Sequence, residues 1–188
     1  MFDLKLYSVS DKYIEYLRNT VDIHVFANTD DYYVHTRKYV GIVLEIGSYK
    51  YYVPMSSPKK TDYMYDRSGH KAVRKSIIPI IRMIDRSDDG SVELMGTLKL
   101  SNMIPVPEAE LQLYDLDNEP DHAYKDLVQK EVRFINRHTK EILKNANVIY
   151  NQKQNGSTEI GYLKSTLDFK ALEKALDRFI NCDISDDE

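Results

Sequence analysis

The sequence contains a single cysteine, Cys182, no tryptophan and no long apolar run. One cysteine excludes an internal disulfide and a zinc site built on cysteines. Residues 77–84 are the longest apolar candidate, but they include Arg82 and fall far short of the ~18 residues that a membrane helix needs. Asp3 and Lys5 stand where the apolar part of a secretion signal would have to lie. We therefore expect a cytoplasmic protein with no membrane partner.

The motifs of common hydrolases and nucleotide-binding enzymes are also missing. There is no Gly-rich phosphate loop, no HExxH, no pair of CxxC motifs and no GxSxG. The five histidines are scattered, and no two stand four residues apart, the spacing that would hold a metal on a helix face. We therefore expect neither a metal site nor a cofactor.

The chain has 188 residues, of which 42% are hydrophobic and 11% aromatic. This composition can build one hydrophobic core and argues against wholesale disorder. A length of this size suits one domain better than two. We expect a single domain over residues 1–182, followed by an acidic, disordered tail over residues 183–188.

The first two thirds of the chain have the patterns of β-strands. Residues 39–46 and 49–55 are apolar and rich in β-branched or aromatic residues, and Gly47 and Ser48 between them suit a two-residue hairpin turn. Further strands are predicted over residues 2–9, 76–84, 91–100 and 103–107. Pro79 has no backbone donor, so its strand is expected at a sheet edge or at a bulge. Residues 20–38 and 56–75 have no clear period and are predicted to be loops.

The last third of the chain has helical spacing. Apolar residues repeat every three or four positions from about residue 121 to 146, which predicts one long amphipathic helix, or two with a break near Arg137. Ser10 and Asp168 are suitable N-caps for helices over residues 11–19 and 169–181. The sequence therefore predicts an α+β fold, with an antiparallel sheet of about six strands followed by helices.

The net charge is -4, but the acidic and basic residues are distributed unevenly along the sequence. Residues 37–82 hold ten Lys and Arg against three acids, whereas residues 83–121 hold ten acids against two bases. Such asymmetry can give an acidic protein one basic face that binds a polyanion. A solvated loop whose lysines point in all directions is the alternative interpretation.

The segment MSSPKK, residues 55–60, stands at the end of a predicted core strand. A sheet fixes the backbone there, and a loop beyond it can reach a ligand. Hydroxyl donors can position a phosphate, and lysine can stabilise developing negative charge. An ordinary Ser-Pro turn with solvated lysines explains the same residues, and the pattern alone leaves both interpretations open.

The segment YVGIVLEIGSYKYYVPMSSPKK, residues 39–60, resembles the most characteristic part of the ToxN/AbiQ family, the toxins of type III toxin–antitoxin systems. There a strand of the form IGIVLEI, a Gly turn and a strand ending in proline lead into [ST]-S-P-K. Two further segments resemble the family in the same order: LYSVSDKYIEYL from residue 6, and GTLKLSNMIPVPEAEL from residue 96, which continues into AYKDLVQKEVRFI. The matches run through most of residues 4–146.

The resemblance implies a compact, strongly twisted antiparallel sheet flanked by helices, related to the Kid/MazF-like ribonuclease toxins. It implies metal-independent cleavage of single-stranded, A-rich RNA. The nucleophile would be the 2′-hydroxyl of the RNA itself, and the products would carry a 2′,3′-cyclic phosphate and a 5′-hydroxyl. This reaction needs a base, an acid and donors for the phosphate oxygens, but no metal and no cofactor.

The resemblance also implies roles for individual residues. Ser57 matches the family's essential serine, Ser56 its hydroxyl neighbour, and Lys59 the lysine two positions further on. We expect Ser57 to position the scissile phosphate, and Lys59 to transfer a proton or stabilise charge. Tyr13 and Tyr33 match site tyrosines, and Arg37 stands where lysine is usual; it would clamp a phosphate, because arginine is always protonated. The basic segment adds four residues expected to bind RNA: Lys60, Arg74, Lys75 and Arg82.

The expected partners are RNAs. The family implies a small repeat RNA antitoxin, pseudoknot-like, whose units bridge adjacent toxins in a closed multi-copy assembly. It also implies phage defence by abortive infection. Two other functions remain open from the sequence: a non-catalytic RNA-binding module on the same fold, and a small structural protein with an incidental basic loop.

Overall fold

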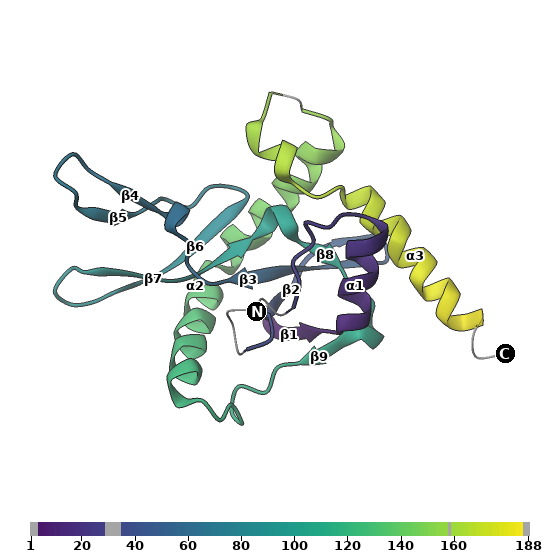
Figure 1. The fold of residues 1–188 in the computed structure, drawn as a ribbon, viewed down its shortest axis with the longest axis horizontal. Helices are drawn as coiled ribbons and strands as arrows, with labels where there is room; N and C mark the ends of the chain where they lie inside the picture. Colours follow the sequence, from purple (N-terminus) through teal and green to yellow (C-terminus); the bar gives the residue numbers. More distant parts are fainter. Residues whose placement is uncertain (1–3, 29–34, 158, 186–188) are drawn as a thin grey trace.

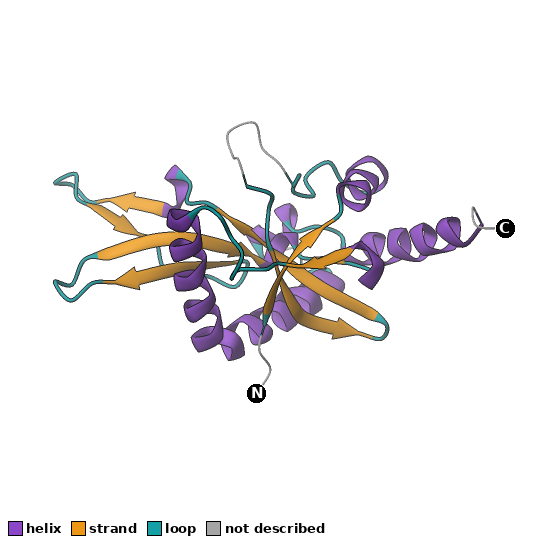
Figure 2. Ribbon diagram, turned by 90° about the horizontal axis from the view of Figure 1, so that it is seen from below, coloured by secondary structure: helices purple, strands orange, loops and turns teal. Residues whose placement is uncertain are grey.

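The computed structural model describes residues 4–28, 35–157 and 159–185. Its centre is a strongly twisted antiparallel sheet (Figures 1 and 2). Its strands follow the order β6 (Ile80–Arg86), β7 (Val92–Lys99), β3 (Tyr49–Ser56), β2 (Tyr39–Ile46), β1 (Lys5–Val9) and β9 (Leu111–Leu113), and the short β8 (Ile104–Pro105) pairs with β3. The predicted α+β class and antiparallel sheet are confirmed, with seven strands in place of about six.

The hairpin of β2 and β3 forms the middle of the sheet. Val40 pairs with Val53 and Ile46 with Tyr49, so the turn falls at Gly47 and Ser48, as predicted. Gly47 has a φ of 60°, a left-handed conformation that glycine adopts without the steric cost of a Cβ. This central hairpin fixes where β3 ends.

A second, two-stranded sheet lies beside the main one, where the sequence predicts only a loop. β4 (Tyr63–Tyr65) and β5 (Lys71–Val73) form a hairpin that follows a short 3₁₀ helix, η1 (Lys60–Asp62). The loop prediction over 56–75 is therefore wrong for these residues. Both strands are three residues long and largely exposed, so no alternation of apolar residues marks them. Figure 1 shows this hairpin and the β6–β7 hairpin projecting from the same end of the protein.

β6 is an edge strand of the main sheet, as predicted, but it begins at Ile80, after Pro79, and not at residue 76. It also contains a register irregularity between Met83 and Ile84. β9 has no counterpart in the predicted strands. It is three residues long and pairs with β1, so its pairing depends on a partner more than 100 positions away in the sequence.

Three α-helices complete the fold of the described residues. α1 (Asp11–Thr20) is capped by Ser10, whose side chain accepts a hydrogen bond from the Tyr13 amide, as predicted. α2 (His122–Gln154) is one helix of 33 residues, which decides between the two predicted alternatives. It packs on β2, β6 and β7. α3 (Phe169–Ser185) begins after Asp168 and ends three residues beyond the predicted domain boundary.

Candidate active site

A cavity of about 260 Å³ opens where β3 ends. The loop before β2, the end of β3 with the loop after it, β7 and α2 all contribute to its walls. Its polar lining includes Arg37, Lys38, Ser56, Ser57, Lys59 and Glu131. The structure therefore brings the predicted residues Ser56, Ser57, Lys59 and Arg37 together around one cavity.

The end of β3 is held on both sides. On one side the Met55 amide donates to the carbonyl of Lys38 at 2.9 Å, and Nη1 of Arg37 donates to the carbonyl of Met55 at 2.7 Å. On the other side, Oγ1 of Thr97 on β7 donates to the carbonyl of Ser56 at 3.4 Å. These bonds fix the backbone from which the Ser57 side chain projects, and Ser57 itself is exposed to solvent.

Lys59 is positioned by a buried carboxylate. Oδ2 of Asp62 accepts a hydrogen bond from the Lys59 amide at 2.9 Å, and the Asp62 amide donates to the Lys59 carbonyl at the same distance. Asp62 is 1% exposed and forms an ion pair with Arg82 on β6, 3.0 Å from Nη2 to Oδ1. Nζ of Lys59 lies 5.9 Å from the centre of the Phe26 ring. The loop that carries Lys59 is thus anchored to the sheet through Asp62.

Two bases line the cavity from the loop before β2. Arg37 donates from Nε to the carbonyl of Ala27 as well as from Nη1 to Met55, so its guanidinium braces the loop against β3. Lys38, which the sequence did not single out, is buried; its Nζ donates to the carbonyl of Thr36 and lies 4.4 Å from the centre of the Tyr114 ring. Burial lowers the pKa of Lys38.

Glu131 on α2 is the acidic group of the cavity, and sequence reasoning missed it. It is 6% exposed, and burial raises its pKa to about 7. The sequence offered one signal: Glu131 takes the place of an apolar residue on the buried side of α2, between Val128 and Ile135. A carboxyl group with this pKa is present in both its protonated and its ionised form at neutral pH.

A ring pair was also missed at the cavity rim. The His35 and Tyr124 rings stack 3.8 Å apart with 4° between their planes, and Nε2 of His35 lies 3.4 Å from a carboxylate oxygen of Asp121. Both rings line the cavity. No spacing in the sequence connects them, because His35 precedes β2 and Tyr124 lies in the first turn of α2.

Two basic hollows lie in the same half of the protein as this cavity. One of about 700 Å³ lies between the β4–β5 and β6–β7 hairpins and is lined by Lys71, Arg74 and Lys75. Another of about 430 Å³ lies between β6 and α2; its bases include Arg82 and Arg86 on β6 and three residues of α2, Lys130, Arg133 and Arg137. The two hollows share Ser76, Arg82, Ile84 and Arg86, and the smaller one shares Met95 with the cavity. The smaller hollow therefore adjoins both the larger one and the cavity.

Comparison with known proteins identifies the family. Residues 5–177 match the family model described as "Toxin ToxN, type III toxin-antitoxin system". The chain belongs to the ToxN toxin family. The resemblance of its sequence to ToxN and AbiQ is thereby confirmed.

Individual relatives agree with this assignment. The chain is 33% identical over 172 residues to the endoribonuclease ToxN of Pectobacterium atrosepticum, which covers 91% of each protein. It is 31% identical to the endoribonuclease AbiQ of Lactococcus lactis subsp. lactis, over 90% of this chain and 86% of AbiQ. A solved structure concerned with selective inhibition of a type III toxin by a non-coding RNA pseudoknot matches with a TM-score of 0.73 and 25% identity, over 95% of this chain and 98% of that one.

In this ToxN-family protein, two residues predicted to bind RNA are buried. Tyr13 is 0% exposed; its hydroxyl donates to the carbonyl of Pro105, and its ring packs against Phe179. Arg82 is 6% exposed and is bound to Asp62 and to the carbonyl of Lys75. Tyr13 presents no surface to RNA, so its predicted role is wrong. Arg82 lines both hollows with a small exposed part, but its guanidinium is held by Asp62, and its contact with RNA stays a prediction. Residue type and charge do not reveal burial.

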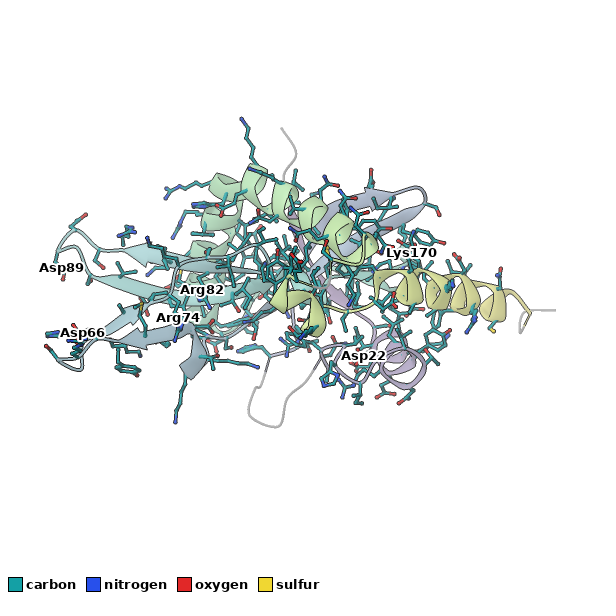
Figure 3. All side chains as sticks on the ribbon, turned by 90° about the horizontal axis from the view of Figure 1, so that it is seen from above. Asp22, Asp66, Arg74, Arg82, Asp89 and Lys170 are labelled. Carbon is teal, nitrogen blue, oxygen red and sulfur yellow. The ribbon has the colours of Figure 1, made fainter. Side chains whose placement is uncertain are left out.

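The other predicted RNA-binding residues have different positions. Lys60, Arg74 and Lys75 are exposed, and Arg74 donates from Nε to the carbonyl of Tyr63 at the base of the β4–β5 hairpin. Figure 3 shows Arg74 and Arg82 near the base of the two hairpins, with Asp66 and Asp89 at the tips. Tyr33 lies outside the described residues.

Among the residues that the structure describes, no group of three or more His, Cys, Asp or Glu side chains could hold a metal ion. In the same part of the chain, no helix has the length and apolar character of a membrane span.

Proposed function

We propose that this protein is an endoribonuclease toxin that a cognate repeat RNA holds inactive, and that it acts in the cytoplasm as part of a phage defence by abortive infection. Its family and its two endoribonuclease relatives support this proposal. The observation that carries it is the cavity at the end of β3, which two hydroxyls, a lysine and a carboxyl group line, with two basic hollows nearby.

The chemistry we propose is attack by the 2′-hydroxyl of the RNA on the adjacent phosphorus, which leaves a 2′,3′-cyclic phosphate and a 5′-hydroxyl. The RNA supplies the nucleophile, so the protein has to bind the phosphate, stabilise its charge and move two protons. The hydroxyls of Ser56 and Ser57 are suited to hold the non-bridging oxygens. Lys59 is suited to stabilise the charge and to donate a proton to the leaving 5′-oxygen.

The substrate strand would lie along the basic hollows beside the cavity. Arg74, Lys75 and Lys71 face the hollow between the two hairpins, while the bases of α2 face the other. Nζ of Lys71 lies 3.7 Å from the centre of the Tyr63 ring, and Tyr65 is 63% exposed. Exposed aromatic rings among cations are the arrangement that stacks unpaired bases, each worth roughly 1–3 kcal/mol.

The inhibitor we propose is a small repeat RNA with a pseudoknot-like fold, each unit of which lies in this groove and bridges to a neighbouring toxin. A related toxin is inhibited by a non-coding RNA pseudoknot, as the structural comparison reports. A closed assembly of toxin and RNA follows if each unit contacts two toxins. Size measurement of the co-expressed complex tests this point.

Cleavage of an A-rich oligonucleotide tests the enzymatic function directly. We expect the purified protein to cut it, and the Ser57→Ala variant to bind it but cut it far more slowly. Binding of the oligonucleotide without cleavage by the wild-type protein would establish the alternative, a non-catalytic RNA-binding module.

Chelation of divalent metals should leave cleavage unchanged, because the groups proposed to move protons belong to the protein and the RNA. The measurement is the cleavage rate in EDTA and in Mg²⁺, with end-group analysis of the products. We expect equal rates and a cyclic phosphate end. Activity that disappears in EDTA and returns with Mg²⁺ would overturn the proposed chemistry.

Substrate and antitoxin should compete, because both need the same basic surface. Charge reversal in Arg74→Glu should weaken binding of both RNAs and reduce the salt dependence of each. The matched control is Lys174→Glu, a reversal at an exposed lysine of α3, which lies away from the hairpins. We expect antitoxin RNA to displace a labelled, uncleavable oligonucleotide from the Ser57→Ala variant. A stable ternary complex would show that the two RNAs bind different surfaces.

A further inference from the structure

We propose that Glu131 is the general base of the reaction, the group that takes the proton from the attacking 2′-hydroxyl. This inference rests on the proposed RNA cleavage and assigns one of its two proton-transfer steps. It is based on the position of Glu131 in the cavity and on the charged groups around it.

Glu131 reaches the end of β3 across β7. A Cβ placed on Gly96 of β7 would overlap Oε1 of Glu131 and would lie 3.3 Å from the carbonyl oxygen of Ser56. The carboxyl group of Glu131 therefore fills the space above Gly96, next to the backbone that carries the two serines. Because Gly96 has no side chain, a group on α2 can approach this part of the site.

Glu131 is a buried residue, and its carboxyl group, which lines the cavity, has no partner within the described part of the chain. It forms no hydrogen bond and no ion pair there, and burial is the only cause of its raised pKa. Glu173, the other glutamate with a similarly small exposed fraction, is different. Its Oε1 accepts hydrogen bonds from Tyr51 and Tyr150, and its Oε2 pairs with Lys170 at 2.7 Å. Burying an unpaired carboxyl group costs free energy, so a protein that keeps one beside a cavity has a use for it.

Cations and polar rings line the cavity together with Glu131. They are His35, Arg37 and Lys38 before β2, Lys59 after β3, and Tyr124 on α2, the helix that also carries Glu131. None of them forms an ion pair with Glu131. Near neutral pH an ionised fraction of Glu131 can therefore accept a proton, and a substrate hydroxyl in the cavity would be its partner.

The step balances in protons and bonds. Glu131 accepts the proton of the 2′-hydroxyl while the 2′-oxygen forms a bond to phosphorus. The bond from phosphorus to the 5′-oxygen breaks, and the Lys59 ammonium gives a proton to that oxygen. Glu131 ends protonated and Lys59 neutral, and exchange of one proton through water restores both.

The test is the cleavage rate of Glu131→Gln under single-turnover conditions, measured with a labelled A-rich oligonucleotide across pH 5.5 to 9. Glutamine keeps the shape of the side chain but cannot accept the proton. We expect its rate at pH 8 to fall by about 10²–10⁴-fold, the usual contribution of general base catalysis. The wild-type rate should rise with pH through about 7, and this rise should be absent from the variant. The matched control is Glu15→Gln, an exposed glutamate of α1 that lines none of the three hollows, which should behave as wild type.

Thermal unfolding separates a catalytic loss from a structural one. The pKa of Glu131 lies above its ordinary value in the folded protein, so the folded state binds more protons and loses stability as pH rises from 4.5 to about 7. Glu131→Gln should lack this loss. Relative to wild type, its melting temperature should therefore increase over that interval. Antitoxin RNA should bind the variant as tightly as it binds wild type.

Several outcomes would overturn the inference. A Glu131→Gln variant that cleaves at the wild-type rate with the same rise through pH 7 removes Glu131 from the chemistry. If Glu131→Gln fails to fold, Glu131→Asp replaces it; this variant should be slower but keep the pH-dependent rise, and a flat profile contradicts the proposal. Wild-type protein that cuts no RNA would instead reject the proposed function, and equal cleavage by Ser57→Ala would reject the site.

Discussion

The Ser57→Ala variant is expected to cleave RNA about 10²–10³-fold more slowly than wild type, the usual cost of losing one hydrogen-bond donor to the charged transition state. Ser57 lies beyond the last residue of β3 and is exposed, so its truncation leaves no cavity in the core. The free energy of unfolding should change by no more than about 0.5 kcal/mol. Cleavage rate and chemical denaturation of the same preparation test both statements.

Ser48→Ala is the matched control, because Ser48 is an exposed serine in the turn at the opposite end of β3. It should cleave as wild type does.

Lys59→Arg tests the role of Lys59: it keeps the positive charge but removes a lysine that can donate a proton. A rate near that of wild type would assign Lys59 to charge stabilisation, whereas a loss as large as that of Lys59→Ala would assign it to proton transfer. If Ser57→Ala still cleaves at the wild-type rate, the cavity is not the active site.

Most of the fold could be predicted because its largest elements have clear local patterns. β2 and β3 are apolar runs joined by a Gly turn, and the 33 residues of α2 repeat at helical spacing. β9 and the β4–β5 hairpin could not be predicted. Each strand is three residues long, and its pairing is decided by a partner strand and not by its own composition.

The candidate site could be predicted where it is contiguous in sequence. Ser56, Ser57 and Lys59 follow one strand and stay together in the fold, which places them in one cavity. Glu131 comes to the cavity from a helix more than 70 positions later, and only the path of α2 across β7 brings it there. The bases of α2 repeat along one helix face at positions 130, 133 and 137, a pattern that the charge count over residues 37–82 did not include.

Arg82 has a structural role that the sequence did not predict. Asp62 and Arg82 are 1% and 6% exposed and form a buried ion pair between η1 and β6. Replacing Asp62 with asparagine leaves the guanidinium of Arg82 buried without its counter-charge. It also removes the negative charge near Lys99, whose Nζ lies 4.0 Å from Oδ1 of Asp62. Breaking a buried pair in this way costs about 3–5 kcal/mol. The whole domain is stabilised by only about 5–15 kcal/mol, so we expect Asp62→Asn to be folded but much less stable.

The control is an exposed pair of the same kind. Nζ of Lys130 lies 3.0 Å from Oδ2 of Asp85, with both side chains about two fifths exposed. Asp85→Asn should cost no more than about 1 kcal/mol, because solvent screens this pair. Chemical denaturation of the two variants measures the difference directly. A loss in Asp62→Asn as small as that in Asp85→Asn would show that the buried pair contributes little.

The same pair should affect catalysis through Lys59, whose amide donates to Oδ2 of Asp62. At a temperature where Asp62→Asn is still folded, its cleavage rate should fall because the loop that carries Lys59 loses its anchor to β6. Adding Arg82→Gln removes the second charge and with it the unpaired guanidinium, so the double variant should be more stable than the sum of the two single losses predicts. It should not regain cleavage, because Asp62 is still absent. Recovery of both stability and cleavage in the double variant would show that Arg82, and not the Asp62 bond to Lys59, controls the position of the loop.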